Sequence, residues 1–314
     1  MAALFAGSNL PASAQTVQGQ LVDRETGAPV EGALVVLLGE DGREDDGYLT
    51  NLAGRFILRA SGQGTYTVRA ERIGFGTVSS ASFTLAQGQL YQLSLETETE
   101  AIPLEGITVQ GEQRCVVRPG EGLEVSRVWE EARKALTVQN WTEQEDAYRF
   151  QIANYSREMD PEARRVHEET RSVKTGVSRN PIGSLPAEDL MTGGFIRENA
   201  DGTLRYLGPD ASTLLSDIFL DTHCFELETD DDQPNLIGLA FKPVQQGDLR
   251  DIQGTLWVDR GTSALQFLEY GYTWAQHPAA RGLARGRLEF EGLPNGSWIV
   301  RKWWIRMPQL AEGR

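Results

Sequence analysis

The sequence predicts a mainly β protein with two domains, an N-terminal β-sandwich and an α+β domain with a curved antiparallel sheet and two to three helices. Short β-branched and aromatic runs alternate with turn residues over residues 17–75, as in all-β sandwiches. An acidic stretch without periodicity follows at residues 97–110 and is typical of a linker. The 314 residues leave room for two cores, which we expect at residues 15–96 and 111–314.

Several strands and the turns between them account for the first domain. Gly tolerates positive φ at such turns and Pro presets φ, which favours tight connections. The strands are expected at residues 17–22, 33–38, 56–58 and 64–68, and residues 83–95 continue the β pattern.

Turn and core residues of this domain recur in a characteristic order. They are Gly19, Asp23, Thr26, Gly27, Pro29, Val30, Gly32, Ala33, Thr50, Gly54, Phe56, Gly64, Tyr66, Val68, Ile73, Gly74 and Phe75. Their order resembles the carboxypeptidase regulatory-like domain, a transthyretin-like sandwich. The resemblance implies a β-sandwich that stabilises the protein or serves as an interaction module, and it implies no reaction.

Acidic residues outnumber basic ones by 45 to 30, which gives a formal net charge of −15. Such a charge repels phosphate backbones and anionic lipids, so nucleic acid is not an expected partner. No run approaches the roughly 18 apolar residues that cross a bilayer, and no transmembrane segment is predicted.

The first residues and the cysteines bear on the compartment. Residues 1–14 end in Ala12, Ser13 and Ala14, a small-residue site of the kind a signal peptidase cuts. We interpret this segment as a signal peptide remnant, with an uncleaved tail as the alternative. An exported chain is expected to be periplasmic or secreted, with association to the outer membrane as a further option.

Cys115 and Cys224 are the two cysteines of the chain, and neither lies in a C-x-x-C pair. In an exported protein they predict one disulfide. It would close a loop of about 110 residues and contribute roughly 4 to 5 kcal/mol in the chain-entropy model. Two buried free thiols are the alternative.

Two segments of the second domain have helical spacing. Apolar residues recur at i, i+3 and i+4, which predicts an amphipathic helix at residues 126–138. Asp210 is expected to cap a further helix, with Leu214, Leu215, Ile218 and Phe219 on one face. A helical turn at residues 186–191 and strands at residues 147–155 and 165–174 complete this part.

The remainder alternates as strands do. They are expected at residues 225–228, 236–241, 253–259, 264–272, 283–290 and 298–307. The pattern over residues 241–274 resembles the periplasmic lipoprotein-carrier fold, a curved antiparallel sheet wrapped round helices. The resemblance implies a concave apolar surface for an acyl chain or another apolar ligand. Alternatively, the helices fill that side and nothing binds there.

Aromatic residues of this sheet are candidates for ligand contacts. They are Trp257, Phe267, Trp274, Trp303 and Trp304. Adjacent Trp303 and Trp304 are expected on opposite faces of one strand, because side chains alternate along a strand. Exposed aromatics mark carbohydrate or protein contacts, and core packing is the alternative.

Metal and catalytic motifs are sparse. His223 and Glu226 form an H-x-x-E pattern, and His277 is the third candidate for a zinc site. We expect no zinc there, because a strand turns His223 and Glu226 to opposite faces. Calcium is the other metal considered, and its candidate ligands are Asp230, Asp231 and Asp232. No nucleophile elbow or phosphate-binding loop is present, so neither catalytic residues nor a cofactor are predicted.

The predicted function is that of a non-enzymatic, exported cell-envelope protein of a Gram-negative-type bacterium, with an interaction sandwich and a second domain that binds a ligand or partner. Its expected partners are an envelope protein, a carbohydrate or a lipid. Two rivals remain, a zinc-dependent carboxypeptidase-like hydrolase and an assembly partner of a TonB-dependent outer-membrane transporter. The latter rests on residues 104–114, which resemble the segment that follows this module in those transporters.

Overall fold

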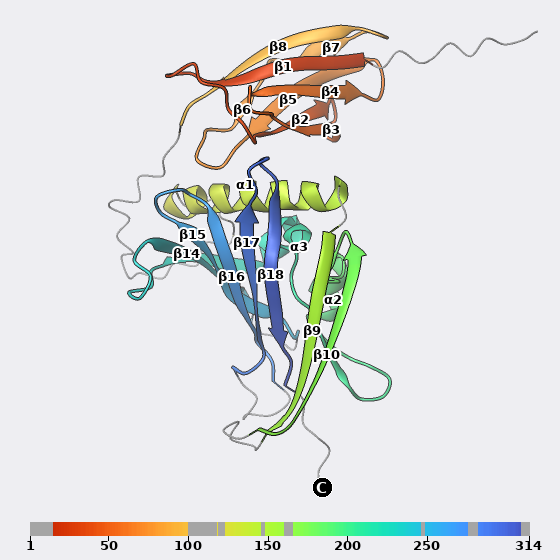
Figure 1. The fold of residues 1–314 in the computed structure, drawn as a ribbon, viewed down its shortest axis with the longest axis vertical. Helices are drawn as coiled ribbons and strands as arrows, with labels where there is room; N and C mark the ends of the chain where they lie inside the picture. Colours follow the sequence, from red (N-terminus) through yellow and green to blue (C-terminus); the bar gives the residue numbers. More distant parts are fainter. Residues whose placement is uncertain are drawn as a thin grey trace, which may run out of the picture. The chain divides into compact units, whose positions relative to one another are not determined.

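The computed structural model of the chain describes residues 15–99, 118, 123–145, 148–159, 166–245, 249–275 and 282–308. These residues fall into two compact units, one at residues 15–99 and one formed by most of the described residues from 118 to 308. Figure 1 shows the elements of each unit. None of the described helices is long and apolar enough to cross a membrane. The expected signal peptide remnant at residues 1–14 and most of the expected linker lie outside the described residues.

Two sheets face each other in the N-terminal unit. In the first sheet β1 pairs antiparallel with β4 and parallel with β8. The second has the order β3-β2-β5-β6, and β7 also pairs with β5. The strands are β1 (Gln15–Asp23), β2 (Leu34–Gly39), β3 (Glu44–Leu49), β4 (Arg55–Ala60), β5 (Gly64–Glu71), β6 (Val78–Ser79), β7 (Phe83–Leu85) and β8 (Leu90–Thr97). The predicted sandwich is confirmed.

Alternation along the strands places the core between the two sheets. In β4, Phe56, Leu58 and Ala60 are buried while the residues between them are exposed. They share one hydrophobic cluster with Leu21 of β1 and Leu37 of β2. Both sheets therefore supply side chains to one core, as in other sandwiches.

Strand β3 was not expected from the sequence. It begins with three acidic residues, lies at the edge of its sheet and is mostly half-buried. The carboxylates of Asp46 and Asp45 accept hydrogen bonds from the backbone N–H groups of Arg59 (2.6 Å) and Ser61 (2.8 Å). These carboxylates satisfy donors at the edge of the facing sheet, which would otherwise need water.

The C-terminal unit is built on a six-stranded antiparallel sheet in which neighbours in sequence are neighbours in space. The strands are β13 (His223–Glu228), β14 (Leu236–Pro243), β15 (Ile252–Asp259), β16 (Leu265–Tyr272), β17 (Arg285–Gly292) and β18 (Trp298–Arg306). Each overlaps the strand that the sequence predicts. The alternation of apolar and polar residues was sufficient to predict these strands, because strands that are consecutive in the sequence are also neighbours in the sheet.

Helix α1 (Leu123–Glu145) packs across one face of this sheet, which we call the helix face. The ring of Trp129 lies 6.2 Å from that of Phe225 on β13. The same face carries a row of buried leucines, which are Leu239, Leu256, Leu268 and Leu288. Side chains of the protein therefore fill the side that the carrier-like interpretation would leave open for an acyl chain. The opposite face is called the outer face.

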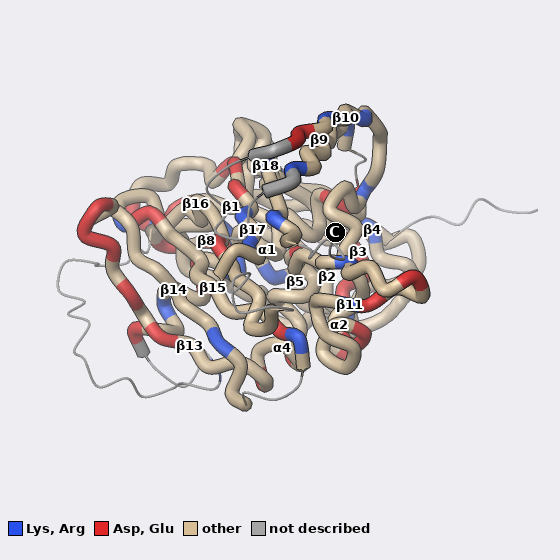
Figure 2. Tube along the Cα trace, turned by 90° about the horizontal axis from the view of Figure 1, so that it is seen from below, with Lys and Arg blue, Asp and Glu red and all other residues tan. Residues whose placement is uncertain are grey.

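The segment between α1 and the sheet contains a hairpin and several short elements. They are β9 (Tyr148–Met159), β10 (Val166–Ser178), α2 (Ala187–Gly193), β11 (Ile196–Glu198), β12 (Leu204–Tyr206), α3 (Ala211–Leu215) and α4 (Asp217–Thr222). The β9–β10 hairpin is a two-stranded sheet with exposed Tyr155, Val173 and Val177. Figure 2 shows Lys and Arg residues along it.

The single helix expected after Asp210 is wrong. Asp210 does cap α3, since its Oδ1 accepts a hydrogen bond from the N–H of Thr213 at 2.8 Å. The helix then breaks at Ser216, whose φ of −69° and ψ of 139° are extended. The Ser216 hydroxyl accepts from the N–H of Phe219 at 3.3 Å and so begins α4. Apolar spacing continued across the break, and for this reason the pattern did not reveal it.

Candidate functional site

A cavity of about 1320 Å³ lies on the outer face of the six-stranded sheet. Strands β14 to β18 contribute lining residues, among them Lys242, Gln253, Glu269, Gly271, Arg285 and Trp304. The strand register places these side chains on the outer face, because Gln253, Gly271 and Arg285 lie directly opposite one another on β15, β16 and β17. The strands supply the floor of the cavity, and α4 and the loops beside β14, β15 and β16 supply further lining residues, among them Asp221, Asp251 and Trp274.

Gly271 explains why the sheet is hollow at this point. A Cβ atom at Gly271 would have the carbonyl oxygen of Ala284 as its nearest neighbour, 3.7 Å away. Its backbone needs no positive φ. The missing side chain thus leaves open space between Gln253 and Arg285, and that space is part of the cavity.

A tyrosine cluster supports the same strands from the helix face. Tyr270 lies between Gly254 and Gly286. A Cβ atom at Gly286 would overlap its ring, and a Cβ atom at Gly254 would overlap its Cα and Cβ atoms. Tyr272 packs edge-on against it and donates a hydrogen bond to the carbonyl of Leu207 at 2.9 Å. Burial raises the pKa of both tyrosines, so both remain neutral hydroxyls. These two side chains therefore place no charge beneath the floor of the cavity.

Two of the five predicted aromatic residues line the cavity, Trp274 and Trp304. The guanidinium carbon of Arg250 lies 4.1 Å from the ring centroid of Trp274, and that of Arg285 lies 6.0 Å from Trp304. Each arginine can hold its indole in place by a cation–π contact. Both tryptophans line one cavity although 30 positions separate them in the sequence.

The other three aromatic residues lie elsewhere. Trp257 and Phe267 pair across the β15–β16 hairpin with ring centroids 6.2 Å apart, and both are buried. Arg287 covers Phe267, with its guanidinium carbon 3.7 Å from the ring centroid. Trp303 lies opposite Leu288 on the helix face. The expected opposite orientation of Trp303 and Trp304 follows from this register.

Charged side chains of both signs surround the cavity. Glu269 forms an ion pair with Arg287 at 2.5 Å, and Lys242 with Glu226 at 3.0 Å. The lining thus mixes carboxylates, amines and indoles, so it suits a ligand with polar groups and an apolar face better than a hydrocarbon chain.

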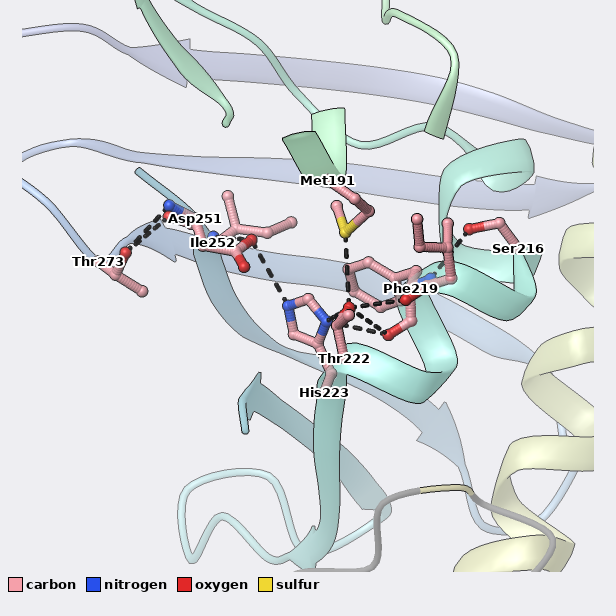
Figure 3. A network of polar contacts seen from close by, with 9 residues as sticks. Met191, Ser216, Phe219, Thr222, His223, Asp251, Ile252 and Thr273 are labelled. Carbon is pink, nitrogen blue, oxygen red and sulfur yellow. Dashed lines mark hydrogen bonds and ion pairs between the residues drawn. The ribbon is translucent and has the colours of Figure 1, made fainter. Parts of the chain in front are cut away.

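A buried histidine lies next to the cavity (Figure 3). His223 is 0% exposed, and its Nε2 is 3.6 Å from Oδ1 of Asp251, which lines the cavity. Its Nδ1 is 3.0 Å from the carbonyl oxygen of Phe219. Thr222 contributes a hydroxyl 3.2 Å from the same nitrogen. The side chain thus connects the end of α4 with the start of β15.

The structure does not bring His223 and Glu226 together as zinc ligands. Glu226 lies on the outer face beside Lys242, whereas His223 shares the helix face with Phe225. The third candidate, His277, lies outside the described residues. Within the described ranges, no group of three or more His, Cys, Asp or Glu residues is placed to hold a metal ion.

The calcium candidates lie in the turn between β13 and β14. Asp230 accepts hydrogen bonds from the N–H of Asp232 at 3.0 Å and from the side chain of Gln233 at 2.9 Å. Its carboxylate therefore stabilises the turn. Asp231 is exposed.

Cys224 is buried on β13, and the described residues contain no free cysteine. Cys115 lies outside the described residues. The pairing of Cys115 with Cys224 stays a prediction.

Sequence reasoning missed the residues that give the cavity its shape and charge, namely Gly271, Asp251, Lys242 and Arg285. One signal was available. Glycine occurs near the same level of three consecutive strands, at Gly254, Gly271 and Gly286, and glycine inside a strand often marks a close approach or an open site.

Comparison with known proteins identifies the N-terminal unit. Its two facing sheets form a β-sandwich. Residues 16–98 match the model of the carboxypeptidase regulatory-like domain, which confirms the resemblance inferred from turn and core residues. No curated protein matches the chain. The carrier-like resemblance of the C-terminal half stays a prediction.

Solved structures similar to the chain include the Bacillus anthracis TIE protein, at 16% identity over 27% of this chain and 17% of that one, with a TM-score of 0.25. Klebsiella pneumoniae 5-hydroxyisourate hydrolase is 22% identical over 27% of this chain and 90% of that one, with a TM-score of 0.23. A minor pilin of Streptococcus agalactiae is 15% identical over 29% of this chain and 46% of that one, with a TM-score of 0.24. The chain thus spans less than a fifth of the first of these proteins.

Proposed function

We propose that this chain is a non-enzymatic, exported cell-envelope protein whose C-terminal unit binds a ligand in the outer-face cavity. The N-terminal sandwich would serve as its interaction module. The observation that carries the proposal is the cavity of about 1320 Å³ above Gly271, with Trp274 and Trp304 in its lining. Ligand sites are concave, partly aromatic and contain a few placed polar groups.

The chemistry of the cavity favours a polar ligand over an acyl chain. The helix face is packed with leucines and covered by α1, whereas the outer-face cavity offers Lys242, Glu269 and Arg285 beside its indoles. Burying charged groups against hydrocarbon is costly, because their interactions with water are lost. We therefore place the binding function on the outer face.

Replacement of Gly271 by leucine tests the cavity directly. A leucine would fill the space without backbone strain, because nothing lies within 3.7 Å of the new Cβ atom. Gly261→Leu is the matched control, since Gly261 lies in the turn at the other end of the same hairpin and also lacks a positive φ.

Immobilised wild type, Gly271→Leu and Gly261→Leu proteins would be exposed to bacterial envelope extract, and retained small molecules identified by mass spectrometry. We expect one or more molecules that wild type and Gly261→Leu retain and Gly271→Leu does not. Identical retention by all three proteins would contradict a function in this cavity.

An exported chain is expected to contain the Cys115–Cys224 disulfide, because disulfides persist in oxidising compartments. We expect the thiols to resist alkylation when the protein is made in the periplasm and to react after reduction, as mass spectrometry of the intact chain would show. Full alkylation without a reductant would contradict a structural disulfide.

A further inference from the structure

We propose that Asp251 is the carboxylate that binds hydroxyl groups of an oligosaccharide in the outer-face cavity, and that His223 is the positioning residue that fixes this carboxylate. The proposal rests on the proposed function, because it names the ligand class of the same cavity.

The His223 ring has no freedom to turn. It stacks on Phe219 with ring centroids 4.0 Å apart and meets Phe241 edge-on at 5.8 Å. The side chain is fully buried. A ring held in this way presents its two nitrogens in fixed directions.

The two ring nitrogens of His223 have different neighbours. The Phe219 carbonyl, 3.0 Å from Nδ1, can only accept, so Nδ1 carries a proton and donates. Nε2 faces Asp251 Oδ1 at 3.6 Å and has no hydrogen-bond partner. Nε2 is therefore the nitrogen that faces the carboxylate, and the contact at Nδ1 sets its orientation.

The backbone of Asp251 is fixed as firmly as the ring. Its N–H donates to the Thr273 hydroxyl at 3.1 Å, and its carbonyl accepts from the Thr273 N–H at 2.9 Å. Oδ1 also accepts from the N–H of Ile252 at 2.8 Å. The described contacts of the carboxylate all use Oδ1, which leaves Oδ2 for a group in the cavity that Asp251 lines. A binding group that is already oriented loses little entropy when the ligand arrives.

The neighbours of Asp251 define the ligand class. Trp274 follows Thr273 directly, and the Gln253 amide and Trp304 line the same cavity. A carboxylate and an amide bind hydroxyl groups, while an indole face packs against the C–H face of a sugar ring. The volume exceeds the roughly 300–1,000 Å³ typical of small-molecule sites, which suits several linked rings. A net charge of −15 disfavours an acidic polymer, so the oligosaccharide is neutral.

Binding is tested with the full chain by isothermal titration calorimetry. The probes are cellotetraose, maltotetraose, laminaritetraose and the tetramer of N-acetylglucosamine, with monomeric sodium decanoate as the acyl probe. The variants are Asp251→Asn, His223→Phe, the double variant, Gly271→Leu and the control Gly261→Leu, each checked for folding by circular dichroism. His223→Phe retains an aromatic ring against Phe219 and Phe241, so the packing is preserved.

We expect at least one tetrasaccharide to bind wild type and Gly261→Leu equally. Asp251→Asn should weaken binding about tenfold or more, because a hydrogen bond to a charged group is lost. His223→Phe should weaken it as well, and the double variant should bind no more weakly than Asp251→Asn, because His223 acts through Asp251. Additive losses in the double variant would show that His223 does not act through this carboxylate and would overturn its assigned role.

The outcomes separate this proposal from the proposed function. If a tetrasaccharide binds wild type, fails to bind Gly271→Leu and binds Asp251→Asn normally, the cavity is the site and Asp251 is not its anchor. If the tetrasaccharide binds Gly271→Leu as well as wild type, the cavity itself is not the site. Binding of decanoate alone, or of no probe, overturns the oligosaccharide assignment.

Discussion

The ionisation of Glu143, near the end of α1, is linked to the stability of the fold. Burial first, and then the nearby carboxylate of Asp210, raise its pKa from 4.5 to about 7. The folded state holds this proton more tightly than the unfolded state. The resulting stability is complete below pH 4.5 and is lost as the pH rises to about 7.

We expect Glu143→Gln to leave the free energy of unfolding nearly unchanged at about pH 4 and to raise it at about pH 8. The gain is about 1–2 kcal/mol, reduced from the full effect because the carboxylate keeps some contact with solvent. Urea unfolding at the two pH values measures it. Asp210→Asn should lower the Glu143 pKa while it preserves the helix cap, and an equal gain at both pH values would contradict the assignment.

Gly271 on β16 has room for a Cβ methyl group, whereas Gly286 on the neighbouring strand β17 has none. At Gly286 an added Cβ atom would overlap the ring of Tyr270, whereas at Gly271 it meets nothing closer than 3.7 Å. We expect Gly286→Ala to reduce the free energy of unfolding by about 1–3 kcal/mol and Gly271→Ala to leave it unchanged or slightly higher. Chemical denaturation of both variants measures the difference, and equal destabilisation would contradict it.

At the scale of elements, the break between α3 and α4 depends on Ser216. Its hydroxyl accepts from the N–H of Phe219 and donates to the carbonyl of Thr213 at 2.7 Å. We expect Ser216→Ala to cost about 1 kcal/mol of unfolding free energy, because α4 loses its cap, and Ser216→Thr to cost much less. Thermal unfolding followed by circular dichroism compares the two. Equal losses would place the effect in packing and not in the cap.

Strands and helices were predictable where their pattern is local. Alternation revealed all six strands of the sheet, and i, i+3, i+4 spacing revealed α1. The pattern did not reveal β3, whose polar residues are stabilised by bonds from Asp45 and Asp46 to another sheet. The cavity was hidden for a related reason. Its aromatic residues were candidates, but only the folded arrangement of strands and loops decides that Trp274 and Trp304 line it while Arg287 covers Phe267.

At the scale of the whole molecule, the two units have separate cores. We expect calorimetry to resolve two unfolding transitions. With the proposed Cys115–Cys224 disulfide in place, a reductant should lower only the transition of the C-terminal unit, which contains β13. The free energy of unfolding of this unit should fall by roughly 4–5 kcal/mol in the chain-entropy model. Cys224→Ser should reproduce it without a reductant, and a shift in both transitions, or in neither, would contradict the pairing.

One hydrogen atom, the side chain of Gly271, sets how far the cavity extends toward the backbone of β16. Replacement of Gly271 by alanine, valine or leucine would reduce, step by step, the length of the longest ligand that fits in the cavity. The surrounding hairpin would keep its register. Homologous proteins that differ only there would select ligands of different length on an otherwise identical scaffold.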